Sequence, residues 1–154
     1  MHMPTPSAGH RRFERMAGIW EGEETMYPSA WDPEGGTAIG RTVGRVAVGG
    51  FALVIDYQQT RGGVETFSGH GIYTFDPGSK EYAMTWIDSI GSPPEHFTGT
   101  FTDDVLVLGH GGPPMHVRMR ADYSRPDRIA SSMEMSEDGR TWKTLFDADY
   151  RRVG

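Results

Sequence analysis

The sequence predicts an all-β protein, an antiparallel up-and-down β-barrel of about ten strands with a short N-terminal helix. Apolar and polar residues alternate in about ten short segments, and this period of two is typical of strands. The 21 glycines and 10 prolines separate these segments and favour turns. Only 4 leucines occur among the 154 residues, which is too few for the core of a helical bundle.

A helical period occurs once, at residues 10–16, where Phe13 and Met16 would share one face. Residues 1–9 are rich in Pro, Ser and Gly, so we expect a disordered tail, followed by a single domain over residues 10–154. The strands are predicted at residues 19–27, 37–48, 51–60, 64–75, 80–88, 95–102, 105–108, 115–123, 128–135 and 141–151.

Short turns join nearly all of these strands. Gly49-Gly50 is a two-residue hairpin signal, residues 76–79 and 137–140 are turns, and residues 109–114 form a Gly- and Pro-rich loop. Short links imply antiparallel neighbours, because a parallel crossover needs about a dozen residues or more. No second helix can cover an open sheet, so the meander closes most simply into a barrel. A barrel of about eight to ten strands can enclose a small ligand.

Composition excludes several classes of partner. The net charge of −6 argues against nucleic acid, whose phosphates require clustered cations. The absence of cysteine excludes disulfides, thiolate catalysis and Cys-ligated metals. No apolar run approaches the roughly 18 residues that span a bilayer, and residues 1–15 lack the apolar stretch of a signal peptide. We therefore expect a soluble, cytoplasmic protein with no membrane partner.

Alternation along the strands assigns bulky side chains, rich in methionine and aromatic rings, to the interior. Methionine adapts to irregular shapes, and an apolar concave pocket with few polar groups is the usual small-molecule site. The same residues would alternatively fill a solid core. The expected ligand contacts are Trp20, Glu24, Tyr57, Met84, Trp86, Met119, Met133 and Phe146. The last strand would turn inward Trp142, Thr144, Phe146, Ala148 and Tyr150.

Two polar residues are candidates for acid–base catalysis in this cavity. Asp88 follows Trp86 on the inner face, and an apolar pocket would raise the pKa of its carboxyl group. Asp88 is equally well placed to cap the turn at residues 88–91. His70 lies between two glycines, which would let a ligand approach the backbone closely. The direction of His70 is ambiguous, and an outward histidine is the alternative.

Other polar residues carry weaker signals. Glu24 needs a partner if it points inward, because an unpaired buried charge is costly. Arg118 and Arg120 alternate with Met119, which indicates a solvated outer face. The histidines have neither the spacing nor the acidic neighbours of a metal site, so we expect no metal and no other cofactor. No nucleophile motif is found in the sequence.

The segment Gly18–Trp20, which follows the predicted helix, resembles the Gly-x-Trp signature of the lipocalin and fatty-acid-binding (calycin) superfamily. Three further motifs follow in order, at Gly49–Phe51, Gly69–Asp76 and Tyr82–Gly91. Together, these motifs are similar to those of the DUF1579 family, a bacterial family of unassigned function. This resemblance covers the chain from about residue 10 to residue 151.

The resemblance implies a calycin-like barrel in which Trp20 closes one end and Arg151 or Arg152 packs over it. It implies no reaction, because the family has no settled activity. Haem barrels of the nitrobindin type are structural relatives that need a proximal histidine near the C-terminus. The last histidine here is His116, so no haem is expected.

Three functions follow as hypotheses. The first is a binding protein that holds a small apolar or aromatic molecule in the barrel. The second is a cofactor-free enzyme, such as an isomerase, cyclase or lyase, with acid–base help from His70 or Asp88. The third is a filled barrel that acts through its surface as an interaction protein, with a homodimer as one form.

Overall fold

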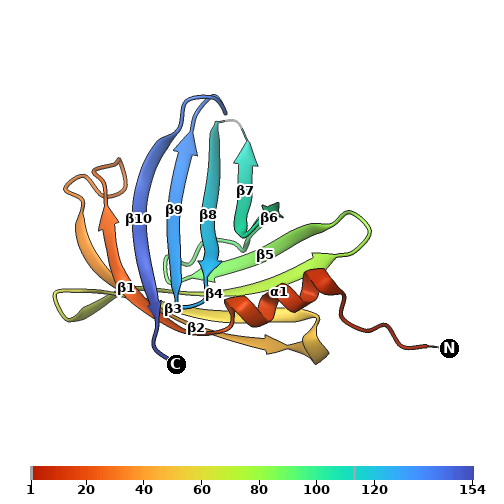
Figure 1. Cartoon of the computed structure of the whole chain (residues 1–154). Coiled ribbons are helices and arrows are strands. Elements are labelled where there is room, and N and C mark those ends of the chain that lie inside the picture. Colours follow the sequence, from red (N-terminus) through yellow and green to blue (C-terminus); the bar gives the residue numbers. More distant parts are fainter. Residues whose placement is uncertain (1, 113) are drawn as a thin grey trace.

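The computed structural model describes residues 2–112 and 114–154, which form a closed barrel of ten antiparallel strands (Figure 1). Each strand pairs with its neighbours in sequence, and β1 pairs with β10 to close the barrel. The up-and-down topology is therefore confirmed. The strands are β1 (Gly18–Met26), β2 (Gly36–Ala47), β3 (Ala52–Arg61), β4 (Val64–Asp76), β5 (Glu81–Asp88), β6 (Glu95–Thr102), β7 (Val105–Gly112), β8 (Met115–Arg125), β9 (Arg128–Ser136) and β10 (Lys143–Arg152).

Strand β7 differs most from its predicted length. It continues to Gly112, through most of the segment that the sequence predicts as a loop. The glycines there are paired with β8, from Gly109 opposite Arg118 to Gly112 opposite Met115, although Gly111 has a φ of 86°. Pairing with a neighbouring strand thus overrides the low strand propensity of glycine. Pro113, the next residue of the predicted loop, lies outside the described residues.

The link between β2 and β3 is also longer than predicted. Instead of a two-residue hairpin, a single 3-10 turn, η1 (Val48–Gly50), joins the strands. The Phe51 N–H donates to the Val48 carbonyl at 3.1 Å. Three consecutive residues have positive φ, with Val48 at 52°, Gly49 at 63° and Gly50 at 95°. Glycine adopts such angles at little cost, which explains why two of them occur at this turn.

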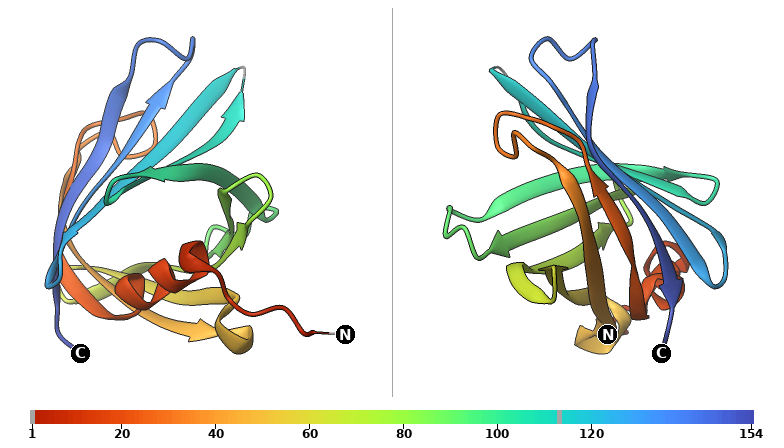
Figure 2. Two further views of the ribbon diagram at one scale, coloured as in Figure 1. Left: turned by 45° about the vertical axis from the view of Figure 1, so that its right-hand side comes forward. Right: turned by 90° about the vertical axis from the view of Figure 1, so that its left-hand side faces the viewer.

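Helix α1 (Ala8–Met16) begins two residues before its predicted start, and it lies against the barrel at the end where β1 begins (Figures 1 and 2). Ser7 precedes the helix, and its backbone N–H donates to His10 Nδ1 at 3.0 Å. Phe13 and Met16 are buried on one face, as predicted. The expected disorder before the helix stays a prediction, and Met1 of that tail lies outside the described residues.

Trp20 and Arg152 close the barrel beside α1. The Trp20 indole donates to the Met16 carbonyl at 3.0 Å. The Arg152 guanidinium lies 4.2 Å from the centre of the Trp20 ring and donates to the Ala17 carbonyl at 2.8 Å. A cation over an indole face, with its N–H groups bonded to carbonyls, holds the C-terminal strand against the helix. Of the two arginines that the resemblance implied for this position, Arg152 occupies it.

The start of β10 corrects one prediction of the inner face. A register shift between Thr144 and Phe146 reverses the alternation, so Trp142 does not continue the inward set. Trp142 instead packs against the guanidinium of Arg118, which lies 3.9 Å from the ring centre. Arg118 also donates two hydrogen bonds of 3.1 Å to Glu134. Arg118 and its partners occupy the outer face, as the sequence predicts for this arginine.

Candidate functional site

The inward-facing side chains form two groups that differ in exposure. Those nearest α1 are buried, including Trp20, Leu53 and Met84 at 1–2% exposure. Those further from α1 remain partly exposed, and we call this region the open half. Its apolar members are Met26, Trp86, Val117, Met119, Met133 and Phe146. The inward side chains of the open half are therefore in contact with solvent.

Four of these residues form one continuous row around the barrel wall. Met119 pairs with Met133, Met133 with Phe146, and Phe146 with Met26. We call these four residues the methionine belt. The next row towards α1 contains Ala148 opposite Glu24, which are 8% and 0% exposed. The change from buried to partly exposed side chains therefore occurs between these two rows.

Trp86 forms the opposite wall, and the glycines of β4 explain its position. A Cβ atom at Gly69 would collide with the indole ring, and one at Gly71 would lie 3.2 Å from ring atom Cε3. The ring therefore lies flat against the backbone of β4. The sequence suggested that these glycines would admit a ligand, but they accommodate Trp86. The indole N–H donates to Asp88 Oδ2 at 2.9 Å.

Glu24 is a buried carboxylate beneath the open half. The Tyr57 hydroxyl donates to it at 2.6 Å, Gln59 Nε2 donates at 3.0 Å, and the Tyr150 hydroxyl also donates. Gly40 makes room for the carboxylate, because a Cβ there would collide with Glu24 Oε2. All three donors are neutral, and together they satisfy a charge that would otherwise be costly to bury. The partner that the sequence requires for Glu24 is thus a set of hydroxyl and amide groups.

The two tyrosines remain protonated donors at neutral pH. Burial raises the pKa of Tyr57, and the negative charge and hydrogen bond of Glu24 raise it further. The same three causes raise the pKa of Tyr150. A raised pKa means that the phenolate is strongly disfavoured, because it would lie beside Glu24 in a region with little water. The cluster therefore keeps its hydrogen bonds over the whole physiological range.

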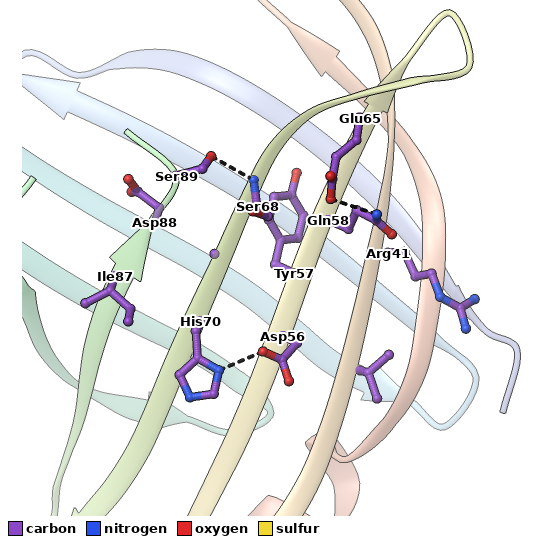
Figure 3. Close-up of a pocket in the computed structure, with 12 residues that line it drawn as sticks. Arg41, Asp56, Tyr57, Gln58, Glu65, Ser68, His70, Ile87, Asp88 and Ser89 are labelled. Carbon is purple, nitrogen blue, oxygen red and sulfur yellow. Dashed lines mark hydrogen bonds and ion pairs between the residues drawn. The ribbon is translucent and has the colours of Figure 1, made fainter. Parts of the chain in front are cut away.

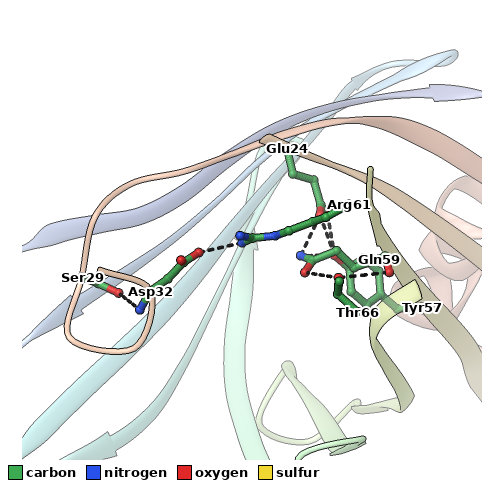
Figure 4. A network of polar contacts seen from close by, with 7 residues as sticks. All are labelled: Glu24, Ser29, Asp32, Tyr57, Gln59, Arg61 and Thr66. Atoms are coloured by element: carbon green, nitrogen blue, oxygen red, sulfur yellow. Dashed lines mark hydrogen bonds and ion pairs between the residues drawn. The ribbon is translucent and has the colours of Figure 1, made fainter. Parts of the chain in front are cut away.

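An ion pair lies at the end of the barrel remote from α1, which we call the mouth. Arg61 is the last residue of β3, and Asp32 lies in the loop between β1 and β2. Their Nη2 and Oδ2 atoms are 2.6 Å apart, and both side chains are 32% exposed. Figure 4 shows Arg61 reaching across to Asp32, with Gln59 and Tyr57 further back on the same strand, β3. Ser29 holds Asp32 in place, since its hydroxyl accepts the Asp32 N–H at 3.1 Å.

His70 faces the outside of the barrel, which is the alternative that the sequence left open. Its Nδ1 atom lies 2.7 Å from Asp56 Oδ1, and it pairs across the sheet with Asp56 and Ile87. Gly69 and Gly71 face the interior beside Trp86, so the intervening His70 must face outward. His70 borders a groove of about 520 Å³ over β2–β5, whose lining also includes Arg41 and Val43 from the outer face and Tyr57 and Asp88 from the inner face (Figure 3).

Asp88 lies on the opposite face from His70, so the two do not form an acid–base pair. Its second oxygen, Oδ1, accepts the Ile90 N–H at 3.0 Å, and its carbonyl accepts the Gly91 N–H at 3.1 Å. Asp88 therefore caps the turn after β5, which was the structural alternative for this residue. Both carboxylate oxygens are occupied, one by Trp86 and one by the turn.

The structure separates the eight predicted ligand contacts. Trp20 and Met84 belong to the buried half, and Glu24 lies below the open half. The other five remain together in the open half: Tyr57, Trp86, Met119, Met133 and Phe146. Sequence reasoning missed Tyr150, Gln59 and Arg61 as site residues. Continuing the alternation from Tyr57 by two and four residues would have identified Gln59 and Arg61, whereas nothing local connects Tyr150 to Glu24.

Over residues 2–112 and 114–154, no group of three or more His, Asp or Glu side chains is arranged to hold a metal ion. No helix in that part of the chain has the length and apolar character needed to cross a membrane. The homodimer stays a prediction.

The family assignment follows from the sequence as a whole. A family described as "Protein of unknown function (DUF1579)" matches residues 5–152. The chain belongs to this family. The resemblance found in its motifs is therefore confirmed. Among curated proteins, none matches this DUF1579 chain.

Solved structures share the fold of this DUF1579 barrel at low sequence identity. Rv2717c from M. tuberculosis is 18% identical, with a TM-score of 0.67 over 96% of this chain and 99% of its own. The S-type phycobiliprotein lyase CPES from Guillardia theta is 11% identical, with a TM-score of 0.61 over 94% and 92%. A redesigned beta barrel is 16% identical, with a TM-score of 0.51 over 94% and 96%.

Proposed function

We propose that this DUF1579 barrel binds a small apolar or aromatic molecule in its open half. The observation that carries the proposal is the change in exposure along the inner face. Side chains near α1 are buried, whereas the methionine belt and Trp86 remain partly exposed although they point inward. Apolar side chains held in contact with water at a concave surface favour a ligand that displaces that water.

The chemistry of the lining supports an apolar ligand with a flat or irregular outline. Three of the four belt residues are methionines, which adjust to different shapes and make favourable contacts with aromatic rings. Trp86 is held flat on β4 and offers an aromatic surface. The carboxylate of Glu24 is buried and already accepts from Tyr57, and Asp88 accepts the Trp86 indole N–H.

Binding is favoured over acid–base catalysis, because His70 and Asp88 face opposite sides of the barrel wall. The structural similarity to a phycobiliprotein lyase supports a role for barrels of this fold with small molecules, by analogy of fold alone. Because of this similarity, any ligand that is found should also be tested for conversion by the protein.

The first test is native mass spectrometry of freshly purified protein, followed by titration with the neutral fluorescent probe N-phenyl-1-naphthylamine. We expect either a co-purifying apolar compound or saturable probe binding. Met133→Trp places a large ring in the methionine belt and should weaken probe binding by about tenfold or more, equivalent to about 1.4 kcal/mol.

Ala130→Trp is the matched control, because Ala130 is exposed and lies on the outer face of the same strand. It should bind the probe as the wild type does. Absence of both a co-purifying compound and probe binding would overturn the proposal. If Met133→Trp and Ala130→Trp bind the probe with equal affinity, the open half is not the binding site.

A further inference from the structure

We propose that Arg61 binds the carboxylate of an amphipathic ligand at the mouth, in the position that the Asp32 carboxylate now occupies. The ligand class is then an apolar or aromatic carboxylic acid, with its body in the open half and its acid group at Arg61. This inference rests on the proposed function and extends it from the apolar body of the ligand to its head group.

The register of β3 places Arg61 on the inner face. Tyr57 and Gln59 both point inward to Glu24, and Arg61 follows Gln59 by two residues. The intervening Thr60 pairs with Ile39, which is 45% exposed on the outer face. The Arg61 charge also acts on Tyr57, lowering its pKa against the larger opposing effects. A guanidinium thus borders the interior of the open half.

Asp32 shows what Arg61 can hold. Its carboxylate lies 2.6 Å from the guanidinium, yet it belongs to a loop and not to the barrel wall. Each side chain is 32% exposed, so solvent reaches both partners. A ligand carboxylate can therefore replace Asp32 at little cost, with the same charge and the planar geometry that guanidinium matches.

The neighbouring polar groups favour an acid over an amine. A ligand amine would need a free acceptor, but the carboxylate of Glu24 is 0% exposed and accepts from Tyr57, Gln59 and Tyr150. Asp88 Oδ2 and Oδ1 accept from the Trp86 indole and the Ile90 N–H, which fix this carboxylate on the turn after β5. Arg61 is therefore the charged group at this part of the inner face whose partner can be exchanged, because that partner, Asp32, comes from a loop.

The test compares two probes that share one aromatic body, 1-pyrenebutyrate and 1-pyrenebutanol, by fluorescence titration at low salt. Wild-type protein should bind both and prefer the acid. Arg61→Gln should weaken binding of the acid by about tenfold and leave binding of the alcohol within about twofold. Asp32→Asn frees the guanidinium and should strengthen binding of the acid several-fold. Arg120→Gln, on the exposed outer face, is the control and should change neither.

The outcomes separate this inference from the proposed function. If neither probe binds to the wild type, the proposed function fails and the inference fails with it. If both probes bind and Arg61→Gln changes neither, or weakens both equally, only the role of Arg61 is overturned. If circular dichroism shows that Arg61→Gln does not fold, the affinity of Asp32→Asn for the acid provides the test instead. An unchanged affinity of that variant for the acid would overturn the inference.

Discussion

At the scale of single residues, Glu24 shows how a barrel stabilises a buried carboxylate with neutral groups. Its three donors come from β3 and β10, and Gly40 on β2 supplies the space. A carboxylate that accepts several hydrogen bonds avoids most of the cost of burial, whereas the loss of one donor leaves part of that cost uncompensated. The cluster also links strands at opposite ends of the chain, so it contributes to closure of the barrel.

Removal of one donor should therefore destabilise the fold. Tyr150→Phe keeps the ring but deletes a hydroxyl that donates to Glu24, and we expect the free energy of unfolding to fall by about 1–3 kcal/mol. Tyr27→Phe is the matched control, because its hydroxyl donates to exposed Asp147 at 2.6 Å on the surface. Urea unfolding measures both. Equal stability of Tyr150→Phe and the wild type would contradict the importance of this hydrogen bond.

At the scale of elements, helix α1 is part of the barrel core and not an appendage. Phe13 is 0% exposed and packs edge-to-face against Tyr82 at a ring separation of 5.9 Å. Arg152 connects the end of β10 to the carbonyl of Arg15 in the helix and to that of Ala17, just after it. Helix, β1 and β10 therefore form one structural unit at the closed end, and the open half depends on that unit for a stable base.

Truncation of the buried aromatic ring tests this dependence. Phe13→Ala should lower the free energy of unfolding by about 3–5 kcal/mol, because it removes a fully buried ring and leaves a cavity. Glu14→Ala changes the next residue, which is exposed, and should have little effect. Thermal unfolding followed by circular dichroism compares the two. A small effect of Phe13→Ala would mean that α1 contributes little to the core.

At the scale of the whole molecule, buried tyrosines make the protein sensitive to alkali. Burial raises the pKa of Tyr73 to about 12 and that of Tyr123 well above its ordinary value, and Tyr57 and Tyr150 shift in the same direction. Above about pH 10 the unfolded chain loses these protons while the folded chain keeps them. Proton release thus favours unfolding, and stability falls as pH rises.

The expected result is a stable plateau up to about pH 9 and a steep loss beyond pH 10. Each such tyrosine should contribute about 1.4 kcal/mol per pH unit to the slope. For Tyr73 the loss ends near pH 12, so Tyr73→Phe should reduce the slope between pH 10 and that value. Urea unfolding between pH 8 and 11.5 provides the profile. A flat profile above pH 10 would contradict the burial of these hydroxyls.

The candidate site was only partly predictable. Strand alternation correctly placed Met119, Met133 and Phe146 on the inner face, because the direction of a side chain along a regular strand is a local property. It failed at Trp142, where the register shift at Thr144/Phe146 is set by pairing with β9. It was ambiguous at His70, whose direction depends on Trp86 packing against the flanking glycines from a different strand.

By itself, the sequence determined the strands, their order, the closure of the barrel and the methionine-rich interior. Short turns and the alternation of apolar and polar residues are local features of the sequence. A ten-stranded meander without a covering layer has few ways other than closure to pair the backbone groups of its edge strands. The tertiary structure alone decided which inward side chains are buried and which remain exposed, and that Glu24 meets Tyr150, 126 residues away. Such distant contacts depend on cross-strand register and closure, which no local pattern encodes.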